Sequence, residues 1–253
     1  MKALFSAFIL VAVPLSLLAQ IKKPEPQQVK IPFAESLQAV VVTTGIWSST
    51  SGNARLYERK SQNAKWRSVG DRFPIVVGRS GLEWAQDSAP EKATQFKKEG
   101  DGKSPAGLFP LTFVFGSAVK PEQLTFPYKR LESQTECVDD VNSTHYNRVV
   151  GRLQVGNFDW KSSEKMLEIG PQYDLGVFVA YNSYPVVRGN GSCIFLHIWK
   201  DASTPTSGCT AMDRTDLERI VAWIDPAKNP YLVQLTEDEY KDLRKSWNLP
   251  KLN

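Results

Sequence analysis

The chain has 253 residues, of which 42% are apolar and 11% aromatic, so it can bury a substantial core within one domain. Its 31 lysines and arginines outnumber 27 acidic residues, and they are scattered without a basic run or a repeat of basic and aromatic residues. This composition excludes the disordered and fibrous classes, and with a net charge of only +4 we expect no nucleic-acid partner.

The N-terminus has the pattern of a secretory signal peptide: Lys2, an apolar run to Leu18, and then the small residue Ala19. A membrane anchor is the alternative, but the run is short for a bilayer span and contains Pro14. We expect a signal peptide at 1–19, a flexible lead at 20–35 and one folded domain at 36–253, with no stable membrane anchor after cleavage.

Short runs of β-branched and aromatic residues between Ser, Gly and Asn turns predict a β-rich domain. The predicted strands are 38–44, 54–60, 72–78, 113–115, 176–182 and 231–235. The strand 176–182 is apolar on both faces, so we place it inside the sheet. Residues 83–101 lack periodicity, and we expect them to form a surface loop of the kind that often lines a cleft.

Two helices are predicted late in the chain. Thr215 and Glu218 have the spacing of a capping box, and apolar residues then follow helical spacing until Pro226 stops the helix. A second amphipathic helix is predicted at 237–247. We therefore predict a mainly β fold of the β-rich α+β type, with peripheral helices near its C-terminus.

The segment Ser192–Trp199 (SCIFLHIW) alternates as a strand does, and we place it beside the strand 176–182. One predicted face carries Ile194, Leu196 and Ile198, and the other carries Cys193, Phe195, His197 and Trp199. The first face belongs to the core. The second carries one of only two histidines in the chain.

The polar segment Lys200–Ser207 contains Pro205, so the chain is expected to fold back and return Cys209 towards His197. A cysteine thiol has a pKa of about 8.5, and a nearby imidazole or oriented amides are needed to make it a nucleophile at neutral pH. Gly208 lets backbone N–H groups approach a substrate carbonyl. The alternative is an inert buried cysteine beside a histidine that serves only as a satisfied polar residue.

Three stretches resemble one known family. Residues 206–212 (TSGCTAM), preceded by IFLHIW, resemble the signature of the L,D-transpeptidase catalytic domain, the YkuD-like cysteine enzymes of peptidoglycan. The segment 101–111 (DGKSPAGLFPL) resembles the family's Gly-Lys-Thr-Pro-x-Gly-x-Phe element, and 75–84 (IVVGRSGLEW) resembles the stretch before it. The resemblance extends from Gln38 to Gln234 and implies the family's twisted β-sheet sandwich, with helices following the cysteine.

The resemblance assigns roles residue by residue. Cys209 matches the nucleophile and His197 its base, while Gly208, Ser207 and Thr206 match the positions that hold the oxyanion and orient the turn. Two features depart from the family. Ser207 stands where many members have a second histidine, and Ala211 and Met212 stand where many have an Arg or Asn.

The implied activity is acyl transfer without a cofactor on the stem peptides of peptidoglycan. Cys209 would form a thioester with the third residue of a tetrapeptide, release D-Ala and pass the acyl group to an amine, giving a 3-3 cross-link. L,D-carboxypeptidase activity or D-amino-acid exchange at the same site stays open, as does a non-catalytic cell-wall binding module. We expect an exported protein, periplasmic or associated with the cell wall; the sequence leaves the acceptor and the oligomeric state open.

The remaining predictions concern residues near the site. With Cys209 free, Cys137 and Cys193 would pair in an exported protein, although sequence alone does not fix this connectivity. The substrate cleft is expected to include Trp199, Tyr146, His145 and Lys103. The acidic pair at 139–140 is interpreted as turn chemistry, and no metal site is expected because neither histidine has a zinc-type spacing.

Overall fold

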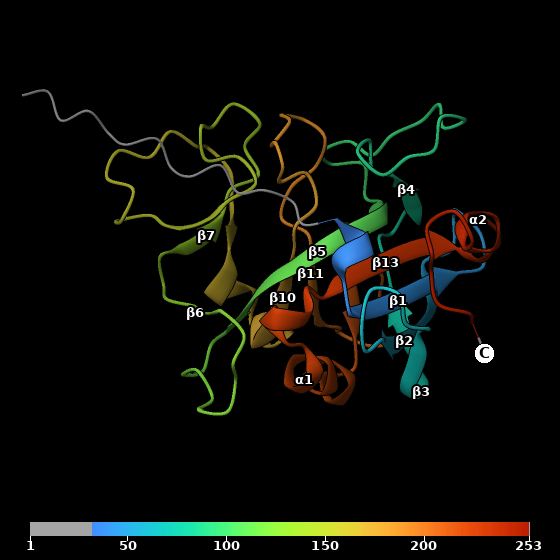
Figure 1. Ribbon diagram of the computed structural model, residues 1–253. Helices are drawn as coiled ribbons and strands as arrows, with labels where there is room; N and C mark the ends of the chain where they lie inside the picture. Colours follow the sequence, from blue (N-terminus) through green and yellow to red (C-terminus); the bar gives the residue numbers. More distant parts are fainter. Residues whose placement is uncertain (1–31, 253) are drawn as a thin grey trace, which may run out of the picture.

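The computed structural model describes residues 32–252, and Figure 1 shows their arrangement. The predicted signal peptide at 1–19 lies outside the described residues, as does most of the predicted lead at 20–35. Within this lead, Phe33 is buried and its ring packs against Trp66 and Tyr231 at centroid distances of 5.8 and 5.3 Å. Phe33 therefore packs on the folded domain although it precedes the predicted boundary at 36.

The domain opens with an antiparallel meander. Strand β1 (Gln38–Thr44) pairs with β2 (Ser51–Glu58), and β2 pairs with β3 (Arg67–Val76). The apolar run of β1 is buried on both faces because a second strand, β13 (Tyr231–Thr236), lies parallel to it on its other side. Residues close to the two ends of the domain thus form the middle of one sheet.

The sheet closes on itself. Beyond β13 lies β5 (Ser104–Gly116), and β5 pairs with β10 (Leu175–Val179), which continues through β11 (Phe195–Ile198) and β12 (Thr210–Met212) back to β3. The β5–β10 contact needs Gly176, since a Cβ there would lie 2.1 Å from the Phe115 ring. Two short strands, β4 (Leu82–Trp84) and β6 (Tyr128–Arg130), flank β5.

A smaller sheet covers one end of β10 and β11. It consists of β7 (Thr135–Cys137) between β8 (Val149–Gly151) and β9 (Glu164–Lys165), followed by the 3-10 turns η2 (Met166–Ile169) and η3 (Pro171–Tyr173). We call residues 131–173 the cover segment. Figure 1 shows β7 set apart from the helices of the C-terminal part.

Two helices follow β12, as predicted. Helix α1 (Arg214–Trp223) packs on β10 and β11, and α2 (Glu237–Leu243) packs on β13 and β1. The predicted capping box is wrong: the side chain of Asp213 accepts the hydrogen bond from the Thr215 N–H, which places Thr215 inside the helix rather than at its cap. No helix within residues 32–252 is long and apolar enough to span a membrane.

The two faces of β11 enter two different apolar clusters. Ile194, Leu196 and Ile198 belong to the main core, which includes the buried side of α1. On the opposite face, Phe195 joins a second cluster with Cys209 and parts of the cover segment. The predicted mainly β fold, with its alternating strand and helices after Cys209, is confirmed.

Candidate active site

Cys209 lies at the end of a tight turn. Two hydroxyl groups hold the backbone of this turn through hydrogen bonds. Thr206 Oγ1 accepts from the Gly208 N–H at 3.1 Å and donates to the Cys209 carbonyl at 2.6 Å. Ser104 Oγ donates to the same carbonyl at 2.9 Å and accepts from the Gly78 N–H at 2.8 Å. One hydroxyl from the turn itself and one from the distant start of β5 therefore hold the peptide unit that follows Cys209.

Gly208 is required by close packing of backbone on backbone. A Cβ at this position would lie 3.2 Å from the Lys103 carbonyl oxygen, which is tighter than an ordinary van der Waals contact. Ser207, by contrast, is exposed. The turn thus presses against the start of β5 on one side and opens to solvent at Ser207.

Cys209 lies in a largely apolar cluster, and the residue is only 7% exposed. Phe195 N–H donates to it at 3.3 Å, and the thiol donates to the Cys193 carbonyl at 3.4 Å. Burial raises the pKa of the Cys209 thiol well above its ordinary value, and the charge of Glu164 adds to this effect. In the structure as described, Cys209 is therefore a protonated thiol at neutral pH.

His197 and Cys209 project from the same face of two adjacent strands. Parallel pairing aligns Leu196 with Thr210 and His197 with Ala211, so residues 195, 197, 209 and 211 share a face. His197 Nδ1 lies 2.8 Å from the carbonyl oxygen of Ile198, which selects the tautomer with a proton on Nδ1 and a lone pair on Nε2. The two hydrogen bonds of the sulfur described above are to backbone groups and not to this imidazole.

Burial also sets the charge of the imidazole. His197 is 8% exposed, and desolvation lowers its pKa to about 4, with the Ile198 carbonyl acting in the opposite direction. At neutral pH the imidazole is therefore uncharged. A neutral thiol and a neutral imidazole are the starting state from which any proton transfer between them begins.

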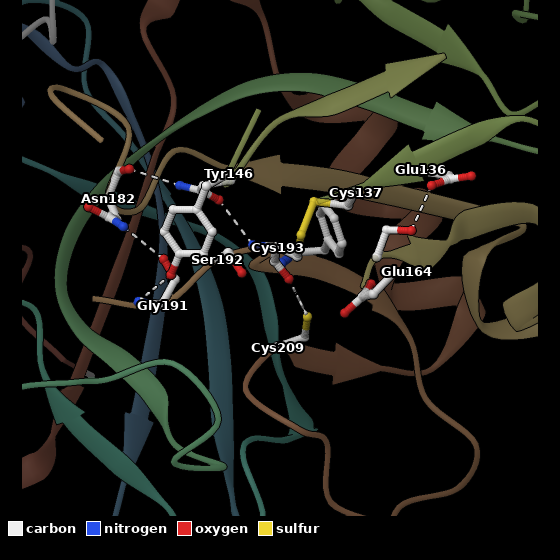
Figure 2. Close-up of a disulfide and its surroundings, with 12 residues drawn as sticks. Glu136, Cys137, Tyr146, Glu164, Asn182, Gly191, Ser192, Cys193 and Cys209 are labelled. Atoms are coloured by element: carbon white, nitrogen blue, oxygen red, sulfur yellow. Dashed lines mark hydrogen bonds between the residues drawn. A yellow bond between two sulfur atoms is a disulfide. The ribbon is translucent and has the colours of Figure 1, made fainter. Parts of the chain in front are cut away.

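A disulfide joins Cys137 of β7 to Cys193, the pair suggested by the sequence, with 5.9 Å between the Cα atoms. Figure 2 shows it above Cys209, whose thiol points towards the Cys193 carbonyl. Cys193 takes a left-handed backbone conformation with φ of 55°, and its N–H donates to Asn147 Oδ1 at 3.0 Å. This irregular stretch explains why β11 begins at residue 195 rather than at the predicted 192.

Family comparison gives one match. Residues 46–233 match the model of the YkuD family, the L,D-transpeptidase catalytic domain, over more than half of the chain. The chain belongs to the L,D-transpeptidase catalytic domain family. The resemblance read from the sequence is thereby confirmed, together with an enzyme class that acts on peptidoglycan. No curated protein and no solved structure matches the chain.

The structure separates the four residues predicted to line the substrate cleft of this L,D-transpeptidase family member. Tyr146 is 2% exposed, and its hydroxyl donates to Glu99 and accepts from the Gly191 N–H, so it supports the loop before β11 rather than facing a cleft. His145 lies within the cover segment, 3.5 Å from Asp159 Oδ1 and edge-on to the ring of Trp160. Trp199 is half-buried at the end of β11.

Of these four residues, Lys103 lies nearest to the Cys209 turn, because its main-chain carbonyl packs against Gly208. Its ammonium group pairs with Glu83 at 2.7 Å, and both line a depression of 370 Å³ whose walls come from residues 83–103. The loop 83–101 therefore lines a hollow, as the sequence suggested, although Cys209 is not part of its wall. Within residues 32–252, no group of three His, Cys, Asp or Glu side chains is arranged to hold a metal ion.

Three side chains near Cys209 were missed by sequence reasoning: Ser104, Glu164 and Tyr173. Ser104 stands within the GKSPAG element, at the position of the family's threonine, so its hydroxyl was a signal that could have been used. Glu164 and Tyr173 lie in the cover segment, outside every motif, and nothing local marks them. Only the folded chain brings them to the sulfur.

Proposed function

We propose that this family member is a peptidoglycan L,D-transpeptidase with Cys209 as its nucleophile. The Cys209 sulfur attacks the carbonyl of the third residue in a tetrapeptide stem, and D-Ala leaves as an amine. The resulting thioester passes its acyl group to the side-chain amine of a second stem, which gives a 3-3 cross-link. The placement of the chain's one free thiol on the same face as His197, one strand away, carries this proposal.

His197 is proposed as the base. Its Nε2 lone pair takes the thiol proton as the sulfur attacks, and the imidazolium then returns that proton to the departing D-Ala nitrogen. The Ile198 carbonyl supports this role because it fixes the Nδ1 proton and stabilises the imidazolium that forms. The lowered pKa supports it too, since the imidazole is uncharged at neutral pH and its Nε2 carries no proton.

The oxyanion assignment changes in one respect. The Gly208 N–H donates to Thr206 Oγ1, so it is not free to bind a substrate carbonyl. We propose that the Cys209 N–H is the donor for the oxyanion and that Gly208 contributes by bringing the backbone close to Lys103. Thr206 and Ser104 then act as positioning residues through the Cys209 carbonyl.

The acceptor decides between the candidate reactions. If water takes the acyl group, the chain is an L,D-carboxypeptidase; a free D-amino acid gives exchange instead. Incubating protein that lacks residues 1–19 with a disaccharide tetrapeptide and identifying the products by mass spectrometry separates a dimer, a tripeptide and an exchanged stem. We expect the dimer, and Cys209→Ala should give no product.

A binding module with an inactive site is the remaining alternative, since Ser207 replaces the second histidine of many members. The departures from the family at Ala211 and Met212 are weaker support for a binding module. Both residues are buried in β12 and present no side chain to a substrate. Incubation with a carbapenem tests this directly. An intact-mass adduct that disappears in Cys209→Ala supports the enzyme, whereas labelling of Cys209 by a thiol reagent without any carbapenem adduct supports the binding module.

We also propose that the protein is exported and works in the periplasm or at the cell wall. The signal-like N-terminus supports this, and so does the Cys137–Cys193 disulfide, because disulfides persist in oxidising compartments. The mass of the protein recovered from a bacterial periplasm should correspond to a chain beginning near residue 20. Full-length protein retained in the cytoplasm would contradict export.

A further inference from the structure

Two side chains that belong to no recognised motif lie close to Cys209. Glu164 comes from β9, and Tyr173 comes from the end of η3. Strand β9 pairs with β7, whose Cys137 forms the disulfide with Cys193. Figure 2 shows Glu164 beside Cys209, on the side of the sulfur that faces the cover segment. The cover segment thus brings a carboxyl group and a phenol to the only free thiol.

The Tyr173 hydroxyl lies between two acceptors. It donates to Glu164 Oε2 at 2.7 Å, and Tyr173 packs in the same apolar cluster as Cys209, where its hydroxyl lowers the pKa of the thiol. Its ring packs edge-on against Phe195 and His197, at centroid distances of 5.5 and 5.2 Å. Because Tyr173 is only 6% exposed, the hydroxyl is held at this position rather than turned to solvent.

A phenol carries one proton and can donate it to one strong acceptor at a time. When Glu164 is ionised, its carboxylate accepts the hydrogen bond from the Tyr173 hydroxyl, and the sulfur then receives no hydrogen bond from Tyr173. When Glu164 is protonated, its own O–H can donate to the Tyr173 oxygen, and the phenol proton is free to point to the sulfur. A donor at the sulfur stabilises the thiolate relative to the thiol.

We propose that Tyr173 is a catalytic residue whose hydroxyl donates a hydrogen bond to the Cys209 thiolate, and that Glu164 controls this donor by competing for its single proton. The inference deepens the proposed function and rests on it, in that Cys209 is taken to be the nucleophile. Glu164 acts through Tyr173 and is a positioning residue.

The charges around Glu164 agree with this arrangement. Burial raises the pKa of Glu164 to about 7; the hydrogen bond from Tyr173 lowers it, and the charges of Asp139 and Glu99 raise it. The neighbouring imidazole of His197 is neutral above about pH 4. Glu164 therefore gains or loses its charge close to neutral pH, where an L,D-transpeptidase of the cell wall would work.

The pKa of the Cys209 thiol depends on the charge of Glu164 as well. Burial is the main cause of the raised pKa of Cys209, and the negative charge of Glu164 is the next. The Phe195 N–H, the Tyr173 hydroxyl and the charge of Lys97 act in the opposite direction. A negative charge on Glu164 therefore disfavours the thiolate of Cys209, and neutralising Glu164 favours it.

The test measures the reactivity of the thiol itself and needs no peptidoglycan. Cys209 is the only one of the chain's three cysteines outside the disulfide, so an adduct with iodoacetamide, counted by intact mass, reports on this sulfur alone. Rates are measured without reductant across the pH range on both sides of neutrality. If the transpeptidase reaction is absent, these rates still decide the role of Tyr173.

Tyr173→Phe keeps the ring and removes the donor, so alkylation should slow about tenfold, the effect of one pKa unit from a hydrogen bond to a charged sulfur. Tyr184→Phe is the matched control, since Tyr184 packs at the edge of the same apolar cluster and should leave the rate unchanged. An unchanged rate in Tyr173→Phe would overturn the proposal.

Glu164→Gln removes the competing charge, and alkylation at neutral pH should become about tenfold faster. The wild-type rate should level off above about pH 7, because the ionised Glu164 then restrains the thiolate, and this levelling should vanish in the variant. Glu168→Gln, an exposed carboxylate in the same cover segment, is the control. A slower or unchanged rate in Glu164→Gln would overturn the proposal even if Tyr173→Phe fails to fold.

The double variant tests whether Glu164 acts through Tyr173. In the Tyr173→Phe background, Glu164→Gln should accelerate alkylation clearly less than in the wild type, because no phenol proton remains to be released. An equal acceleration in both backgrounds would show that Glu164 acts by its charge alone, and the competition for the proton would be rejected.

Discussion

Ser104 Oγ donates a hydrogen bond to the carbonyl oxygen of Cys209 over 2.9 Å, although 105 positions separate the two residues. Thr206 Oγ1 donates to the same carbonyl from within the turn. The backbone at Cys209 is therefore held by the first residue of β5 as well as by its own turn. This contact links the GKSPAG element to the proposed nucleophile, which lies far along the chain.

Ser104→Ala should lower both stability and the rate of carbapenem acylation. The buried Gly78 N–H loses its acceptor, which costs about 1–3 kcal/mol in the free energy of unfolding, and the Cys209 carbonyl keeps only Thr206. Urea unfolding measures the first effect and intact mass over time the second. Ser203→Ala removes an exposed hydroxyl and serves as control; equal behaviour of the two variants would contradict the positioning role.

Reducing the Cys137–Cys193 disulfide should destabilise the domain by about 4 kcal/mol, since the bridge closes a loop across a sequence separation of 56 residues. The measurement is urea unfolding with and without dithiothreitol. Cys209→Ser should show the same response to the reductant, because its disulfide is intact. A variant with alanine at both 137 and 193 should show none. Equal stability of the oxidised and reduced wild type would contradict this prediction.

Acid should destabilise the domain through His197. The unfolded histidine binds a proton below about pH 6.5, whereas in the native state burial lowers the pKa to about 4. The unfolded state therefore binds more protons in this window, and stability falls as the pH falls through it. Relative to His197→Gln, the wild type should lose about 3 kcal/mol between neutral pH and pH 4, measured by urea unfolding. His145→Gln, which changes a half-buried imidazole elsewhere, should retain the wild-type loss.

Helix α1 should depend on Asp213 and not on Thr215. Asp213 accepts from the Thr215 N–H at 2.9 Å and is the true N-cap, so Asp213→Ala should cost about 1 kcal/mol. Thr215→Ala keeps that backbone N–H and should change stability by less than about 0.5 kcal/mol. Thermal unfolding of the two variants side by side checks this, and a larger loss in Thr215→Ala would restore the capping box.

The pattern of apolar and polar residues predicted those strands and helices whose formation depends mainly on residues close in sequence. The alternation in 192–199 correctly assigned Leu196 and Phe195 to opposite faces, because side chains on a strand alternate whatever lies around them. Strand β5 was predicted only at 113–115 although it spans Ser104–Gly116. Prolines are unfavourable inside a sheet because they lack an N–H, yet β5 accommodates Pro105 and Pro110, and only the completed sheet shows this.

The candidate cleft was the least predictable part. Tyr146 and His145 follow each other in sequence, yet one is buried against Glu99 and the other packs beside Asp159. Neither position could be assigned from local pattern, because the cover segment is mostly irregular and its packing depends on a disulfide to a distant strand. The same irregularity hid Glu164 and Tyr173.

The sequence by itself determined the family, the order of most strands, the two late helices and the placement of Cys209 and His197 on neighbouring segments, because each rests on residues a few positions apart. Only the tertiary structure decided which hydroxyls hold Cys209, which carbonyl fixes His197, and that a phenol and a carboxyl group lie at the sulfur. Those contacts form between segments that meet only once the sheet has closed, and burial at that meeting point sets the charges of the groups involved.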